Sequence, residues 1–168
     1  WARRILYYGK ARWCPVCEKT SRKFLKFGLL PRKEARCVHC GALERHRLIW
    51  LFFRRKTNLF DGKPKTVLHV APEECLEDRL RSHLGDHYIT ADLLDPGAMI
   101  KMDIIDIQYP DNHFDVIYCS HVLEHVPNDR RAMKEFRRVL KPDGWAILLV
   151  PITAEQTFPE VGNSAEAQ

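Results

Sequence analysis

The second half of the sequence alternates short apolar runs with amphipathic segments. Runs rich in β-branched and aromatic residues predict strands at 66–70, 88–91, 99–102, 114–119 and 145–150. Apolar residues at helical spacing predict helices over 72–84 and 130–140. Such a strand–helix–strand succession forms a parallel sheet, which binds ligands at the carboxyl ends of its strands. We therefore predict an α/β domain with a mostly parallel sheet over residues 66–168.

The first half follows a different pattern. Short strand-like pieces at 23–27 and 34–36 precede a predicted helix at 42–56, and turn-forming residues follow at 61–64. The apolar face of the helix is too broad for a solvated linker, so we expect it to pack on the following domain. The expected organisation is a small module over 1–41, a connecting helix and linker over 42–65, and the sheet domain.

Four of the six cysteines form two pairs near the N-terminus. Cys14 and Cys17 are separated by two residues, as are Cys37 and Cys40, which gives a C-x2-C-x19-C-x2-C pattern. Two such turns facing each other complete a tetrahedral shell that suits zinc. A closed shell of four thiolates has a structural role and would supply much of the folding free energy of so small a module. A redox pair or a fortuitous arrangement is the alternative.

Charge is divided unevenly along the chain. Residues 1–65 hold 18 Lys/Arg against 4 Asp/Glu, whereas residues 66–168 hold 9 against 18. The split indicates either two units with different partners or two halves that complement each other across an interface. Basic residues interleaved with aromatics suit non-specific contact with single-stranded nucleic acid; alternatively, the aromatics form a small core and the charges are solvated. The residues concerned are Arg12, Lys19, Arg22, Lys23, Lys26, Arg32, Lys33 and Arg36, with Trp13, Phe24 and Phe27.

The composition is that of a globular protein, with 45% hydrophobic and 29% charged residues. No run approaches the ~20 apolar residues that a membrane span needs. No signal peptide is visible either, because polarity returns directly after residues 5–8. We therefore expect a cytoplasmic protein without a membrane partner.

Two later segments carry a family resemblance. The segment 114–126, FDVIYCSHVLEHV, resembles the strand-four region of class I S-adenosylmethionine-dependent methyltransferases. The segment 136–145, FRRVLKPDGW, resembles their approach to strand five, and the pair is typical of the type 11 subgroup. The chain is also similar to a set of such proteins in which a zinc ribbon and an ERHR helix, here 44–47, precede an LHVAPE loop, here 68–73. The resemblance covers about residues 12–151 and implies a Rossmann-like fold with S-adenosylmethionine as cofactor.

The resemblance also implies a cofactor site. Asp92, at the end of the second strand and followed by Leu93, would accept hydrogen bonds from the ribose hydroxyls. Asp103 would accept from the adenine amine, with Ile104 beside the ring. The alternative for either acid is an ordinary solvated turn residue. The remaining expected contacts are the loop residues His69, Ala71 and Glu73, beneath the methionine and ribose, and Ser120, near the sulfonium.

The expected catalytic residue is His121. Methyl transfer mainly requires positioning and desolvation, but a hydroxyl or acidic carbon acceptor also needs a base. His121 follows the fourth strand, and histidine titrates near neutral pH. His125 is the second candidate, although four residues further on it is expected to pack or cap. The acceptor is open: a small molecule, a nucleic acid or a protein.

The sequence departs from the family pattern in two places. The loop at 69–73 lacks the glycines of the usual D-x-G-x-G, and Pro72 removes an amide. Only five strands are expected where class I enzymes have seven, and 152–168 is expected to be an irregular loop. Either the natural chain continues or the domain is shortened, which leaves the fifth strand as an open edge. The alternative function is therefore an inactive methyltransferase-like scaffold whose basic zinc ribbon binds nucleic acid or protein.

Overall fold

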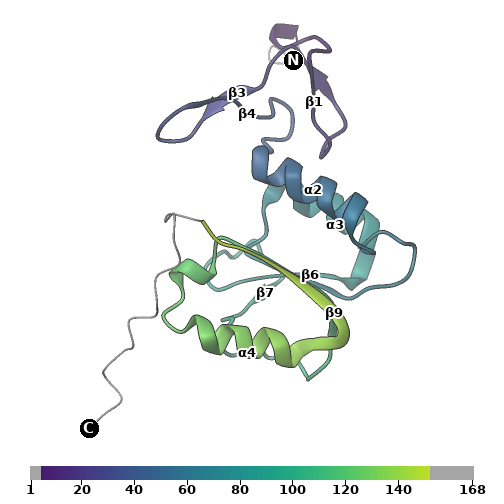
Figure 1. Cartoon of the computed structure of the whole chain (residues 1–168), viewed down its shortest axis with the longest axis vertical. Coiled ribbons are helices and arrows are strands. Elements are labelled where there is room, and N and C mark those ends of the chain that lie inside the picture. Colours follow the sequence, from purple (N-terminus) through teal and green to yellow (C-terminus); the bar gives the residue numbers. More distant parts are fainter. Residues whose placement is uncertain (1–4, 152–168) are drawn as a thin grey trace.

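The computed structural model describes residues 5–151 and shows a small head on a five-stranded parallel sheet (Figure 1). The strand order is β7-β6-β5-β8-β9. Successive strands are therefore added first on one side of β5 and then on the other, and the order switches between β5 and β8. This confirms the predicted Rossmann-like parallel sheet and places its carboxyl ends around the point where ligands bind in such folds. The strands are β5 (Val67–Val70), β6 (Tyr88–Asp92), β7 (Ile100–Lys101), β8 (Phe114–Ser120) and β9 (Leu140–Leu149).

Helices cover both faces of the sheet. Helix α2 (Glu44–Lys56) and helix α3 (Glu74–Leu84) lie on one face, and helix α4 (Asp129–Val139) lies on the other (Figure 1). All four residues of β5 are buried, with Val67 in the hydrophobic cluster under α2 and α3 and Leu68 in the cluster under α4. Alternation of side chains between two covered faces explains why the strand reads as a continuous apolar run. Two short 3-10 helices, Gly85–His87 and Leu123–His125, complete the domain.

Strand β9 begins earlier than the sequence predicts. It starts at Leu140, opposite Phe114 of β8, and its next partner pair joins Trp145 to Val116. Residues 141–144, which precede the predicted strand, therefore form a bulge within the strand. A Cβ atom on Gly144 would lie 2.9 Å from the Asp115 carbonyl oxygen, so only glycine fits this close approach.

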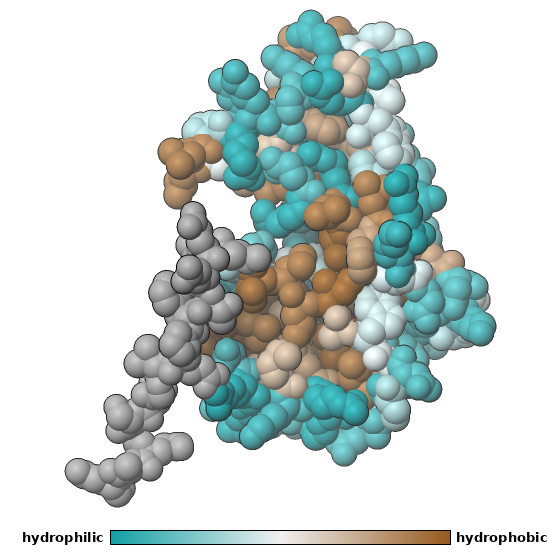
Figure 2. All heavy atoms as spheres, in the orientation of Figure 1, coloured by the Kyte–Doolittle hydropathy of each residue, from teal (hydrophilic) through white to brown (hydrophobic). Residues whose placement is uncertain are grey.

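Among the described residues, β9 pairs only with β8 and forms one edge of the sheet. Figure 2 shows apolar side chains gathered in the middle of the sheet domain, where β9 crosses the view in Figure 1. An unpaired strand edge with an apolar surface is a site of association unless something covers it. The irregular loop expected at 152–168 lies outside the described residues.

The head consists of two small antiparallel hairpins. The two strands of the second hairpin were predicted approximately, as strand-like pieces at 23–27 and 34–36. The first hairpin was not predicted, because its strands are only two residues long and carry no periodic pattern. Phe24 is buried beneath the guanidinium of Arg47, 4.5 Å from the ring centroid, whereas Trp13 and Phe27 are exposed. The aromatics thus form a core only in part. The strands are β1 (Arg12–Trp13), β2 (Thr20–Ser21), β3 (Leu25–Phe27) and β4 (Arg32–Arg36).

Helix α2 connects the head to the sheet. Its Phe53 is 1% exposed and packs edge-on against Tyr118 of β8, with ring centroids 5.3 Å apart. Trp50 of α2, Cys14 of the head and Val67 of β5 belong to one continuous hydrophobic cluster. The prediction that this helix packs on the following domain is confirmed. No helix in the described part of the chain has the length and apolar character needed to cross a membrane.

Candidate functional site

A cavity of about 340 Å³ opens at the carboxyl ends of β5, β6 and β8. Its volume falls within the range of small-molecule sites, roughly 300–1,000 Å³. Six of the nine residues that the sequence predicts for cofactor binding and catalysis line it. They are Ala71, Asp92, Leu93, Asp103, Ile104 and His121.

Asp92 and Asp103 both line the cavity, and the backbone fixes each of them. Oδ1 of Asp92 accepts hydrogen bonds from the amides of Leu94 (2.7 Å) and Asp95 (2.8 Å). Oδ1 of Asp103 accepts from the amide of Ile105 at 3.1 Å. No described residue donates to the second oxygen of either carboxylate. Each side chain is therefore oriented by its own loop and keeps an acceptor oxygen for a ligand.

Two residues that line the cavity have left-handed backbone conformations. Ala71, after β5, has a φ of 51°, and His121, after β8, has a φ of 58°. Non-glycine residues rarely adopt this region, and such strain clusters at functional sites. Ala71 takes the turn that a glycine would normally make, and its amide donates to the carbonyl of Ala91 at 2.9 Å. The loop after β5 thus turns sharply without glycine.

The imidazole of His121 is held at the rim of the cavity. Its Nδ1 lies 3.2 Å from Oε1 of Glu124, and its side chain is 39% exposed. If Nδ1 donates to this carboxylate, Nε2 is a free proton acceptor. His125 also lines the cavity but is exposed, at the end of a 3-10 helix.

The other three predicted residues do not line the cavity. His69 is fully buried in β5, Ser120 is 5% exposed, and the Glu73 side chain is 14% exposed. The Glu73 carboxylate accepts a hydrogen bond from Tyr118 Oη at 3.0 Å and lies 2.9 Å from His69 Nε2. His69 Nδ1 in turn lies 2.6 Å from Tyr88 Oη. These residues form a buried polar network that joins β5, β6 and β8 beside the cavity.

The carboxylate of Glu73 is the centre of this network. Burial raises its pKa, but the hydrogen bond and charge interaction with His69 and the nearby His46 outweigh burial, so the pKa is lowered overall. Burial raises the pKa of Tyr118 well above its usual range, and the neighbouring Glu73 charge adds to this effect. Glu73 is therefore an ionised acceptor and Tyr118 a protonated donor.

Three members of the network were not predicted from the sequence, namely Tyr88, Tyr118 and His46 of α2. Of these three, only His46 lies outside the sheet. The amide of Leu43 donates to His46 Nδ1 at 3.2 Å, and the Cys75 thiol lies 3.0 Å from the same atom. Burial lowers the pKa of His46, so the ring is neutral and Nε2 carries the proton. Nε2 points towards Oε1 of Glu73 but remains 3.9 Å away. The only sequence signal was a histidine on the apolar face of the predicted helix.

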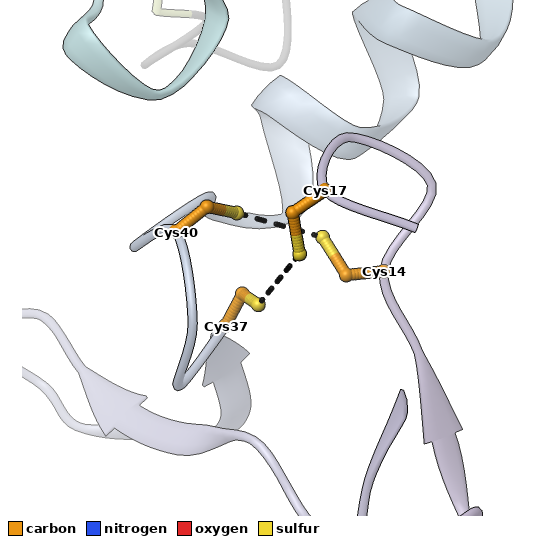
Figure 3. A group of neighbouring side chains, drawn as sticks. All are labelled: Cys14, Cys17, Cys37 and Cys40. Carbon is orange, nitrogen blue, oxygen red and sulfur yellow. Dashed lines mark hydrogen bonds between the residues drawn. The ribbon is translucent and has the colours of Figure 1, made fainter. Parts of the chain in front are cut away.

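A second site lies in the head, where the four paired cysteines converge (Figure 3). Their sulfur atoms all lie within 4.8 Å of one another, and the pairs Cys14–Cys40 and Cys17–Cys37 are each 3.8 Å apart. A tetrahedron with Zn–S bonds of about 2.3 Å has sulfur–sulfur edges of roughly 3.8 Å. The donor set and its spacing therefore fit a zinc ion.

The environment of Cys37 also suits a metal-bound thiolate. The amide of His39 donates to its sulfur at 3.4 Å. Hydrogen bonds with the Cys14 and Cys40 thiols lower the pKa of Cys37 below its ordinary range, and the same contacts raise the pKa of Cys14 and Cys40, so the first proton leaves Cys37. Deprotonation is the step that metal binding requires of a cysteine.

Comparisons with known proteins show similarity over the sheet domain. A family described as a methyltransferase domain matches residues 65–148. The demethylmenaquinone methyltransferase of Staphylococcus carnosus is 36% identical over 61 residues, which cover 36% of this chain and 24% of that protein. The sterol 4-C-methyltransferase of Caenorhabditis elegans is 30% identical over 84 residues, which cover 49% of this chain and 23% of that protein. The chain thus spans about a quarter of the length of these relatives.

A similar solved structure is a SAM-dependent methyltransferase from Archaeoglobus fulgidus. It has 20% sequence identity and a TM-score of 0.46, with 60% of this chain and 51% of that chain covered.

Proposed function

Since this chain belongs to the methyltransferase domain family, we propose that its cavity binds S-adenosylmethionine and that the protein transfers the methyl group to an acceptor. When bound, the cofactor supplies a methyl group on a sulfonium cation, which transfer converts into a neutral thioether. The single observation that carries the proposal is the convergence of Asp92 and Asp103 on one cavity at the carboxyl ends of the strands.

The lining residues fit a nucleoside. The unpartnered oxygen of Asp92 would accept from the ribose hydroxyls, and that of Asp103 from the adenine amine. Leu93 and Ile104 supply apolar contacts for the ring. Ala71 brings the backbone close to the ligand, which is the role of glycine in the usual loop.

His121 is the proposed base for acceptors that must lose a proton. It lines the cavity, and Glu124 orients its ring so that Nε2 can accept the proton. His69, Glu73 and Ser120 would act from behind the cavity wall, where they hold the loop and the end of β8.

Cys14, Cys17, Cys37 and Cys40 are the proposed ligands of a structural zinc ion. All four ligand positions are protein thiolates, so the metal has no open position for a substrate. Its role would be to hold the head in place above α2.

Isothermal titration calorimetry with S-adenosylmethionine tests the cofactor site. The full chain should bind, and Asp103→Asn should weaken binding by about tenfold, the loss of about one charged hydrogen bond. Asp95→Asn is the matched control, because Asp95 lies in the same rim of loops and does not line the cavity. Absence of binding by folded, metal-replete protein would leave the scaffold alternative in its place.

A further inference from the structure

The Glu73 carboxylate is a largely buried charge, and no lysine or arginine within residues 5–151 forms an ion pair with it. Its ion-pair contacts among the described residues are with His46 and His69 only. His69 uses both ring nitrogens in contacts, Nε2 with Glu73 at 2.9 Å and Nδ1 with the hydroxyl of Tyr88 at 2.6 Å. Burial lowers the pKa of His46, which disfavours a compensating charge there. A buried charge without a counter-charge is costly, and such groups are retained where a ligand compensates them.

Two further buried atoms beside Glu73 lack a well-formed hydrogen bond within the described residues. They are Nε2 of His46, whose side chain is 9% exposed, and Oγ of Ser120, which nevertheless lies close enough to Glu73 to help lower its pKa. Unsatisfied polar groups in a native interior are rare and call for a partner that the protein itself does not provide. His46 of the ERHR motif and Glu73 of the LHVAPE motif lie side by side, so the two motifs meet around a polar site whose hydrogen bonds are incomplete.

This site adjoins the cofactor cavity. Ala71 lines the cavity and lies two residues before Glu73, and His121 lines it directly after Ser120. The first turn of α3 begins at Glu74, so Glu73 is fixed at the start of a helix. Charges interact more strongly where little water lies between them, and the Glu73 side chain is only 14% exposed.

We propose that Glu73 is a specificity-determining residue that favours the sulfonium form of the cofactor over its neutral thioether product. The inference rests on the proposed cofactor site. The negative charge of Glu73 attracts the positive sulfur before transfer, and that attraction is lost once the methyl group has left. His46 and Ser120 complete the site by hydrogen bonding to a water that bridges Glu73 to the ligand.

The test compares the affinities of two probes, S-adenosylmethionine and S-adenosylhomocysteine, by calorimetry on the full chain. Glu73→Gln removes the charge at nearly constant shape. It should weaken S-adenosylmethionine binding about tenfold and leave S-adenosylhomocysteine within about twofold. Glu74→Gln, the same change one residue along in an exposed position, should alter neither affinity.

Glu73→Asp keeps the charge while it disturbs the contacts, so it should retain the wild-type ratio of the two affinities even if both fall. Equal weakening of both probes by Glu73→Gln would overturn the proposal, because it would show that Glu73 only holds the loop or binds the ammonium group that both probes share. An unchanged ratio with unchanged affinities would overturn it as well. If the wild-type protein binds neither probe, the proposed function itself fails, which is a separate result.

Discussion

The head and the sheet domain are stabilised in different ways. Besides its cysteines, the head buries few apolar side chains, chiefly Val16, Phe24 and Ala35. The sheet has buried side chains on both faces, organised into two hydrophobic clusters. A module with so small a hydrophobic core needs a bound metal or a covalent cross-link to fold stably, whereas a parallel sheet covered on both faces is stabilised by packing alone. Loss of the metal should therefore affect mainly the head, and loss of packing mainly the sheet domain.

Helix α2 is the one element that couples the head to the sheet domain, because it packs against both. Cys14 and Cys37 share a hydrophobic cluster with Trp50 and Phe53. Loss of the metal should therefore loosen the N-terminal end of α2, where His46 reaches the polar network beside the cavity. The sheet itself should survive.

The largest effect is expected from Cys37→Ser. Structural zinc contributes about 10–16 kcal/mol in zinc-finger peptides at neutral pH, far more than the small core of the head. The variant should lose its zinc and the protection of amides in residues 12–42, while β5 and β8 stay protected. Elemental analysis and hydrogen exchange by mass spectrometry measure the two effects.

Cys119→Ala is the matched control, because Cys119 is a buried cysteine of the sheet. It should keep the zinc and destabilise only the sheet. A wild-type protein without metal, or a Cys37→Ser variant that retains it, would remove the basis of the comparison.

The second effect concerns the packing that joins the two regions. Phe53→Ala should destabilise the chain by about 3–5 kcal/mol, the usual cost of removing a buried phenylalanine. Phe52→Ala, one residue earlier on the same helix and 43% exposed, should cost less than about 1 kcal/mol. Urea unfolding gives both values. Similar losses for the two variants would mean that α2 does not dock on the sheet as the structure shows.

Most of the sheet could be predicted from the sequence, because each buried strand is a continuous apolar run that its length distinguishes from a helix. The bulge in β9 could not be predicted. Pro142 and Gly144 signal a turn in any local reading, and only the approach of the Asp115 carbonyl reveals that the chain continues as a strand. The β1–β2 hairpin was missed because two-residue strands have no period.

The candidate site also has a part that the sequence predicts and a part that it does not. Asp92 and Asp103 follow strands, so topology alone brings them to one rim. The polar network depends instead on His46, Glu73 and Tyr118, which are far apart in sequence and meet because the first turn of α2 packs against the start of α3. Neither the hydrophobic pattern nor the spacing of the motifs predicts that contact.

The third prediction concerns the ion pair between Glu135 and Arg138, which stabilises the sheet domain without any metal. The hydrogen bond from Arg138 lowers the pKa of Glu135 to about 2. The same carboxylate accepts from the amide of Ile107 at 2.9 Å, which ties the segment after β7 to α4. The pKa is lower in the folded state than the ordinary value of about 4.3. The pair therefore stabilises the fold above about pH 4.3, and this contribution is lost as the pH falls towards 2.

Between pH 5 and pH 2.5, the wild-type protein should lose more stability than Glu135→Gln, by on the order of 1 kcal/mol after solvent screening. Thermal unfolding of both proteins across this range measures the difference, since all other carboxylates titrate in both. Parallel curves would show that the ion pair contributes nothing to the sheet domain.

The smallest effect is expected at Ala71, where the sheet domain uses a strained turn. Glycine relieves the left-handed strain of about 1–2 kcal/mol but adds about 0.4–1 kcal/mol of unfolded-state entropy. Ala71→Gly should therefore change the free energy of unfolding by less than about 1 kcal/mol. The cofactor dissociation constant should stay within about threefold, because Glu73 and the hydrogen bond to Ala91 hold the loop from both sides. Calorimetry on the variant decides the point: a tenfold change would mean that residue 71 itself, and not the buried network, sets the shape of the cavity wall.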